Sequence, residues 1–369
     1  MTPDKLLIDG RRVLICLGPG GVGKTTMSAA LAIHAAATGH TVDVMTVDPA
    51  PRLLDALGLE GDASEPRDVP LDLVRTPRRG HHKPGRLRAL RLDPKRTFDA
   101  IVARYASSVA ARDAIIANGI YRNLSNALAG VGDYMAMERL LELAGNAKTQ
   151  LVVLDTPPAA EAIDFLDAPR RLLELLNSRA VGLLGAPGGI LRSQLRFVDM
   201  AARAVLAAFD RVTGLNLLTD VQSFVQSFDG MYAGFAERAE RARDLVRGAD
   251  TSLVVVTTAE AGRIAQAADF VTALEQADLT ISAVIVNRVM AEVPDAADVD
   301  DAKIPAALKR KLRRNLADYG ALKRREENSL DALKTKLPHG ARLIVAHDLG
   351  HEPRTLAELA AIGKDLRFG

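Results

Sequence analysis

The glycine-rich stretch GPGGVGKT, residues 18–25, decides the fold of this chain. It matches the pattern G-x-x-x-x-G-K-[ST] and stands between an apolar run, Val13–Leu17, and a helical pattern, Lys24–Thr38. Glycines between a strand and a helix let backbone N–H groups turn inward around phosphates, and the helix N-terminus adds a positive dipole. We therefore predict a phosphate-binding loop, in which Lys24 reaches the β- and γ-phosphates and the Thr25 hydroxyl holds Mg²⁺.

Two aspartates at the ends of predicted strands belong to the same site. Asp48 follows the run Val42–Val47, and Asp155 follows the run Leu151–Leu154. In open α/β sheets, ligand-facing residues lie at the carboxyl ends of the strands. Either aspartate alone could cap a helix instead. A phosphate loop needs a second acid near its metal and a group that orients the attacking water, so two acids at this edge favour the phosphate site.

Short apolar runs alternate with helical patterns along much of the chain. Runs of this length that are apolar on both faces are typical of buried strands in a parallel sheet. The alternation predicts an α/β fold, with a doubly wound, mainly parallel sheet as a P-loop NTPase core. The predicted strands are Val13–Leu17, Val42–Val47, Leu151–Leu154, Leu253–Thr257, Ile281–Val286 and Leu343–Val345, and the clearest helices are Lys24–Thr38 and Gly262–Leu274.

Two blocks interrupt this alternation with helical patterns alone and predict an inserted α-helical subdomain. The predicted bounds are 95–145 and 172–250 for the subdomain, and 1–94, 146–171 and 251–369 for the core. In the second block, an apolar stripe with spacings of three and four covers residues 221–235. The stripe indicates either a helix packed inside its subdomain or an exposed groove for an apolar client.

Two charged regions lie between the predicted strands. Asp62–Leu87 contains proline, arginine and histidine and predicts a solvated loop, with nucleic-acid binding as a weaker alternative. Glu292–Asp301 is acidic and predicts another loop. The helix after it opens with five cations between Lys309 and Arg314, which indicates a solvated helix face.

The overall composition excludes several classes of protein. With 48 Lys+Arg and 46 Asp+Glu the net charge is +2, so we expect neither nucleic acid nor an anionic membrane as a partner of the whole chain. We find no signal-peptide pattern and no membrane-spanning run, and expect a cytoplasmic protein without stable membrane insertion. The single cysteine, Cys16, excludes an internal disulfide, a multi-cysteine zinc site and a cysteine-ligated iron–sulfur cluster, and is predicted to be a core residue.

Four segments, in order, carry a resemblance to a known family. They are GPGGVGKTT at 18–26, VDPAPRLLDALG at 47–58, LDTPPAAEAIDFLDAPRRL at 154–172 and VIVNRV at 284–289. Through them the chain resembles the ArsA-type ATPases, the arsenical-pump relatives that include the tail-anchored-protein-targeting ATPases. These belong to the deviant-Walker class that also contains MinD and ParA. The similarity continues through RLDPKRTFDAIVARYA, GDYMAMERLLEL and VQSFVQSFDGMYAGF and so covers most of the chain.

The resemblance implies a role for each matching residue. Asp48 corresponds to the switch I aspartate that activates the hydrolytic water, Asp155 to the switch II aspartate near the Mg²⁺ shell, and Asn287 to the adenine-reading asparagine. The implied phosphate-binding residues are Gly20, Gly21, Val22, Gly23, Lys24, Thr25 and Thr26. The expected cofactors are therefore ATP and Mg²⁺, with Asp48 and Lys24 as catalytic residues and Thr25 and Asp155 at the metal.

The resemblance also implies how such a protein works. Relatives of this kind act as nucleotide-sandwich dimers, which ATP closes and hydrolysis opens while the helical subdomains move. We expect a Mg-ATP-dependent dimeric switch that couples the nucleotide state to a protein client or partner through the helical subdomain. The alternatives are a ParA/MinD-like positioning ATPase on DNA or membrane, and a weakly active regulatory subunit of a heteromeric ATPase.

The chain departs from the family pattern in two respects. Pro19 stands where the deviant-Walker class usually has a signature lysine that reaches into the partner's site. That contact must come from elsewhere, or from a paralogous partner, so a homodimer and a heterodimer both stay open. The chain also lacks the thiols of arsenite recognition and the Cys-x-x-Cys pair of the dimer zinc, which places it in a bacterial branch without metal-binding cysteines.

Overall fold

The chain forms two compact units, which we describe separately. The computed structural model describes residues 3–61, 63–71, 85–118, 121, 131–176, 231–292, 299 and 303–368. Unit 1 comprises Met1–Arg91, Leu143–Ile163 and Arg247–Gly369, and unit 2 comprises Leu92–Glu142 and Asp164–Val246. The domain bounds predicted from the sequence differ from these by several residues at each join and stay a prediction.

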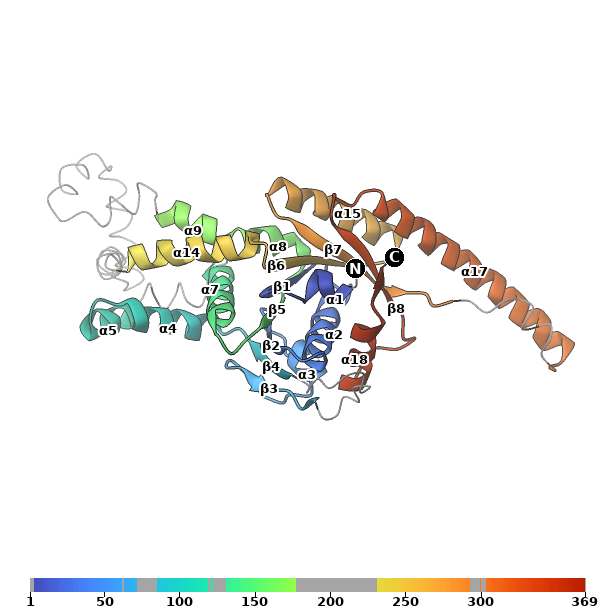
Figure 1. Ribbon diagram of the computed structural model, residues 1–369, viewed down its shortest axis with the longest axis horizontal. Coiled ribbons are helices and arrows are strands. Elements are labelled where there is room, and N and C mark those ends of the chain that lie inside the picture. The colour runs from blue at the N-terminus through green and yellow to red at the C-terminus, as the bar shows by residue number, and fades with distance from the viewer. Residues whose placement is uncertain are drawn as a thin grey trace, which may run out of the picture. The chain divides into compact units, whose positions relative to one another are not determined.

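Unit 1 contains a nine-stranded sheet in the order β3-β4-β2-β5-β1-β6-β7-β8-β9 (Figure 1). Neighbouring strands are parallel except at the two edges, where β3 and β9 are antiparallel to their partners. The strands are β1 (Val13–Leu17), β2 (Thr41–Thr46), β3 (Arg67–Asp68), β4 (Arg86–Arg91), β5 (Leu151–Asp155), β6 (Thr251–Thr258), β7 (Ile281–Val289), β8 (Arg342–His347) and β9 (Arg367–Phe368). The predicted α/β class with a mainly parallel sheet is confirmed.

Helices cover both faces of this sheet, as Figure 1 shows. On one face lie α2 (Lys24–Ala37) and α18 (Leu356–Asp365), and on the other lies α15 (Ala261–Gln276). The shorter helices are α1 (Pro3–Leu7), α3 (Arg52–Ala56) and α8 (Ala159–Leu166), which begins in unit 1. A Cβ at Gly363 of α18 would lie 2.5 Å from the Ala30 carbonyl oxygen, so this glycine permits the close approach of α18 to α2.

The structure corrects one prediction about a connection. The segment Asp62–Leu87 is not a loop throughout, because β3 lies within it and β4 begins inside it. In β4, with the sequence RLRALR, the apolar residues Leu87, Ala89 and Leu90 are buried. The strand went unrecognised because its arginines make the segment look like a solvated charge run. The histidine pair at 81 and 82 lies outside the described residues.

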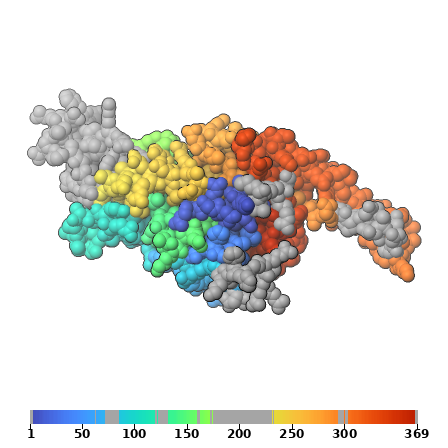
Figure 2. Space-filling model, in the orientation of Figure 1, coloured from blue at the N-terminus to red at the C-terminus, as the bar shows by residue number. Residues whose placement is uncertain are grey.

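The helix α17 (Ala306–Lys334) confirms the predicted basic helix and is largely uncovered. Of its described side chains only Leu333 is buried, whereas Leu308, Tyr319 and Leu322 are 43%, 53% and 47% exposed. Figure 2 shows α17, in orange and red, extending beyond α15. Near its C-terminal half, Glu326 accepts a hydrogen bond from the backbone N–H of Met290, at 2.9 Å, which ties the helix to the end of β7.

Unit 2 is helical in its described residues. Its helices are α4 (Pro94–Tyr105), α5 (Val109–Ala117), most of α7 (Val131–Gly145), α9 (Ala168–Leu176) and nearly all of α14 (Tyr232–Arg247). Its core is rich in aromatic side chains, with Phe98, Tyr121 and Phe235 all buried. Glu138, 1% exposed, forms an ion pair with Arg238 and accepts a hydrogen bond from the Tyr134 hydroxyl, so charged groups cross this core between α7 and α14.

Two sequence expectations can be compared with the structure only in part. Met231 and Phe235, at the end of the apolar stripe, are buried in unit 2, and residues 221–230 of the stripe lie outside the described residues. Within the described part of the chain, no helix is long and apolar enough to cross a membrane.

Candidate functional site

The glycine-rich loop lies between β1 and α2, as the motif predicted. Its glycines adopt backbone angles that other residues avoid: φ is +80° at Gly21 and +92° at Gly23. A Cβ at Gly23 would lie 2.3 Å from Asn287 Nδ2, and one at Gly18 would lie 2.2 Å from the Val256 carbonyl oxygen. At Gly18 and Gly23, any side chain would therefore collide with residues at the ends of β6 and β7.

Lys24 folds back over the loop that precedes it. Its Nζ donates hydrogen bonds to the carbonyl oxygens of Gly18, at 2.9 Å, and Pro19, at 3.0 Å. Burial lowers the pKa of Lys24, and the nearby Asp155 carboxylate opposes that shift. The amine is thus held at the inner wall of the loop, where a phosphate group would take the place of the two carbonyls as its acceptor.

Asp155 is the last residue of β5, and its carboxylate faces the start of α2. Its Oδ2 accepts hydrogen bonds from Thr25 Oγ1, at 2.9 Å, and from Thr46 Oγ1, at 3.0 Å. Its Oδ1 is buried and has no hydrogen-bond partner among the residues that the structure describes. Burial raises the pKa of Asp155 to about 6 against the opposing effect of the two hydroxyls.

Asp48 lies two residues beyond the end of β2, and β2 is the neighbour of β5 in the sheet. Its Oδ1 accepts a hydrogen bond from the backbone N–H of Ala50 at 2.9 Å, which fixes the turn. Its own N–H donates to Thr46 Oγ1 at 3.2 Å, and its Oδ2 lies 3.8 Å from Arg52 Nη1. Asp48 remains 30% exposed, so the carboxylate is reachable from solvent and from the loop.

A cavity of about 540 Å³ lies in front of the glycine-rich loop. Its volume is within the range of small-molecule and cofactor sites. Its walls come from the glycine-rich loop, the Asp48 turn and α3, the segment after β5, and the segment that leads into α18. The predicted site residues that line it are Gly20, Gly21, Gly23, Lys24, Thr25, Thr26 and Asp48. The loop and Asp48 therefore line one cavity. Asp155 does not line it, but its carboxylate accepts a hydrogen bond from Thr25, which does.

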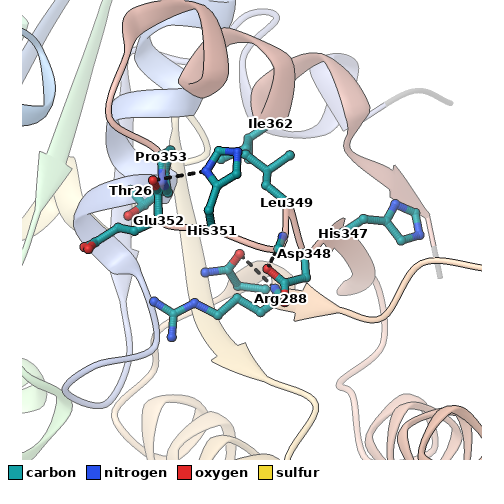
Figure 3. Close-up of a pocket in the computed structure, with 11 residues that line it drawn as sticks. Thr26, Arg288, His347, Asp348, Leu349, His351, Glu352, Pro353 and Ile362 are labelled. Carbon is teal, nitrogen blue, oxygen red and sulfur yellow. Dashed lines mark hydrogen bonds between the residues drawn. The ribbon is translucent and has the colours of Figure 1, made fainter. Parts of the chain in front are cut away.

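A second cavity, of about 370 Å³, lies at the ends of β7 and β8 (Figure 3). It shares Thr26, Arg288, Glu352 and Pro353 with the first. Asn287 lines it, while its Nδ2 donates to the Val22 carbonyl oxygen at 2.9 Å, so the asparagine also supports the phosphate loop from behind.

Arg288 follows Asn287 in a left-handed conformation, with φ +57°, where the pairing of β7 with β8 is irregular. Sparsely populated backbone conformations of this kind concentrate at ligand sites. The backbone thus turns sharply at the point where the two cavities meet.

The residues at the first cavity fit a magnesium nucleotide. A hydroxyl and a carboxylate are ligands that Mg²⁺ accepts, directly or through water, and Thr25 and Asp155 supply them side by side. The buried, unpartnered Asp155 Oδ1 is an acceptor that a metal-bound water would satisfy. In the described ranges, no cluster of three or more His, Cys, Asp or Glu residues forms a separate metal site.

Sequence reasoning missed several residues of this site. Thr46 was not singled out, although a hydroxyl at the end of a strand, two residues before Asp48, is a signal that could have been read. Arg52 and the segment 347–354 carry no local pattern that marks them. They reach the site only because α3 and α18 pack beside the loop.

Comparison with known proteins places the chain in a family. Residues 11–314 match the family described as "Anion-transporting ATPase". The chain belongs to this ATPase family. The matched residues include the loop, both aspartates and Asn287. Of the residues that line the cavity, only Glu352, Pro353, Arg354 and Leu359, before and within α18, lie outside the match.

Individual relatives within the family are distant. "ATPase GET3" of Podospora anserina is 27% identical over 187 residues, covering 48% of this chain and 51% of that protein. "ATPase GET3A" of Arabidopsis thaliana is 29% identical over 183 residues, 50% of this chain and 45% of that protein. An uncharacterized protein of Streptomyces coelicolor is 30% identical over 210 residues, which cover 57% of this chain and 46% of that protein. The chain thus spans about half the length of the curated relatives it matches.

Proposed function

We propose that this chain binds and hydrolyses Mg²⁺–ATP at the cavity in front of the glycine-rich loop. The observation that carries the proposal is the pairing of Thr25 with Asp155 beside a buried lysine at the glycine-rich loop. In the described part of the chain, the buried Asp155 Oδ1 has no hydrogen-bond partner. A lysine, a hydroxyl and a strand-end carboxylate in this order are the phosphate and metal ligands of P-loop ATPases.

Each residue then has a defined task. Lys24 would exchange the carbonyls of Gly18 and Pro19 for phosphate oxygens, and the loop N–H groups would hold the β-phosphate. Asp48, fixed by its turn, would accept a proton from the attacking water and orient it toward the γ-phosphate. Bound Mg²⁺ would neutralise phosphate charge, with Thr25 and Asp155 holding it.

We further propose that ATP binding closes a dimer and that the helical unit passes the nucleotide state to a protein client. This extension rests on the family resemblance in the sequence. It is supported by the position of Asp48 at a turn that a γ-phosphate can order, because switch loops of this kind respond to the presence of that phosphate. The cytoplasmic location expected from the sequence stays a prediction.

The test is ATP hydrolysis by the purified chain with Mg²⁺, with light scattering in the ATP and ADP states. We expect turnover by the wild type, loss of nucleotide binding in Lys24→Ala, and an ATP-loaded dimer that persists in Asp48→Asn because the water is no longer activated. If the wild type shows no ATP binding by calorimetry, and Lys24→Ala behaves like it, the proposal is wrong.

A heteromeric, weakly active subunit is the second candidate, and Pro19 favours it. The loop then lacks the cation that a homodimer of deviant-Walker proteins exchanges between its sites. Turnover that begins only when a paralogous chain is added, with a mixed dimer by light scattering, would support this candidate over the homodimer.

The helix α17 gives some support to the third candidate, a positioning ATPase on DNA or membrane. It combines exposed Leu308, Tyr319 and Leu322 with basic residues, a pattern that occurs in helices at membrane surfaces. Co-sedimentation with anionic liposomes or DNA in the presence of ATP would support positioning. A client-coupled switch should pellet with neither.

A further inference from the structure

The cavity at the loop holds more positive charge than the glycine-rich motif itself provides. Within residues 18–26 Lys24 is the single cation, and Pro19 is neutral. ATP carries one more phosphate than ADP, and that additional charge must be balanced by groups at the outer end of the loop. The cations that line the cavity are Lys24, Arg52, Arg288 and Arg354.

The three arginines lie at different parts of the cavity wall. Arg288 also lines the second cavity, together with Asn287. Arg354 lies just before α18, and its backbone N–H donates to Glu358 Oε2 at 2.8 Å. Arg52 opens α3, beyond the Asp48 turn, and its Nη1 lies 3.8 Å from Asp48 Oδ2. Arg52 is therefore the arginine beside the proposed water-activating acid.

Arg52 and Lys24 face the same space. Both line the cavity, Lys24 from the glycine-rich loop and Arg52 from the start of α3. Two cations that act on each other across a cavity favour an anion between them. The acids that line the cavity are Asp48, Asp55 and Glu352, and of these Asp48 is the one that forms an ion pair with Arg52.

The Arg52 side chain can reorient from Asp48 toward a bound phosphate. It is 73% exposed, so reorientation costs little packing, and at 3.8 Å its contact with Asp48 is an ion pair rather than a short hydrogen bond. A guanidinium has five N–H donors in a planar fork that matches phosphate oxygens, so it can contact a phosphate while it stays near the carboxylate.

We propose that Arg52 contacts the terminal phosphate of ATP in its own chain and makes the site select triphosphate over diphosphate. The proposal rests on the ATP site proposed above and names a cation for it outside the glycine-rich motif. Because ADP lacks the γ-phosphate, the contact exists only in the ATP state. Arg52 would then stabilise the charge that the γ-phosphate carries during transfer to water, beside the carboxylate of Asp48.

The experiment compares the binding of ADP and of a non-hydrolysable ATP analogue, each with Mg²⁺, by calorimetry. In Arg52→Ala we expect analogue affinity to fall about 10-fold or more, the effect of one lost charged hydrogen bond, while ADP affinity stays within about twofold. Arg52→Lys, which keeps the charge, should recover part of the loss. Retained ADP binding also shows that the variant is folded.

Arg354→Ala is the matched control, because it removes the same charge from another wall of the cavity. If it changes the analogue-to-ADP ratio as much as Arg52→Ala, the effect is general electrostatics and the proposal is overturned. Equal losses of analogue and ADP affinity in Arg52→Ala, or no loss at all, overturn it too.

A double variant separates a phosphate contact from an effect through Asp48. In an Asp48→Asn background, Arg52→Ala should still lower analogue affinity, since the phosphate contact remains to be lost. If the loss disappears in that background, Arg52 acts only by holding Asp48, and the proposal is overturned. Absence of any nucleotide binding by the wild type would instead overturn the ATPase function itself.

Discussion

One hydroxyl connects the two acids of the site. Thr46 Oγ1 donates to Asp155 Oδ2 and accepts the backbone N–H of Asp48, and the Thr46 side chain is fully buried. A hydroxyl is suited to this position because it donates and accepts at once. The turn that carries Asp48 is thereby fixed relative to the carboxylate that stands beside Thr25.

Removing that hydroxyl should impair turnover more than stability. Thr46→Val keeps the shape of the side chain and suits a strand, but it leaves the Asp48 N–H without its acceptor and removes one of the two hydrogen bonds to Asp155 Oδ2, the one from Thr25 remaining. We expect kcat for ATP to fall about 10-fold or more, and ADP affinity to change little. Thr46→Ser should restore most of kcat. Wild-type turnover by Thr46→Val would show that the bridge has no role in positioning Asp48.

At the scale of elements, two arginines join β4 to its neighbours in very different surroundings. Arg88 forms a bidentate pair with Asp43 of β2, at 2.7 Å for both hydrogen bonds, and Asp43 is completely buried. Arg86 forms a similar pair with Asp68 of β3, in which both side chains are more than half exposed. The two ion pairs have similar geometry but different burial, so comparing them isolates the effect of burial on stability.

The buried pair should matter far more for stability. Asp43→Ala leaves the Arg88 guanidinium without its carboxylate in the sheet, and we expect a loss of about 3–5 kcal/mol in the free energy of unfolding. Asp68→Ala, at the exposed pair, should cost about 1 kcal/mol or less. Urea unfolding followed by circular dichroism measures both. Similar losses for the two variants would mean that burial does not control the strength of these pairs.

At the scale of the whole chain, Cys16 is a natural probe of core opening. It is fully buried in β1, directly before the phosphate loop, and burial raises its pKa to about 12. The thiolate is the nucleophile that attacks a thiol-specific reagent, so the folded chain should react very slowly and only through opening of unit 1. As the only cysteine of the chain, it needs no engineering.

Nucleotide should slow this reaction. A ligand that binds only the folded site lowers the population of the open state by a factor of 1 + [L]/Kd, so Mg²⁺–ATP at about 100 times Kd should slow Cys16 labelling about 100-fold. The labelling rate with and without nucleotide measures this. Lys24→Ala, in which binding is lost, should show no protection. Equal protection in that variant would place the nucleotide elsewhere.

The sequence by itself determined the fold class, and it predicted the position of the glycine-rich loop and of the two strand-end aspartates, since each depends on a local pattern. The glycines, Lys24 and Thr25 are neighbours in the chain, and a strand followed by an acid can be read within ten residues. Only the tertiary structure decided which side chains support them. Thr46 meets Asp155 across 109 residues. Arg88 of β4, which by itself indicates a solvated run, pairs with Asp43, 45 residues away on β2. Pairs of this kind depend on strand order, which local spacing does not encode.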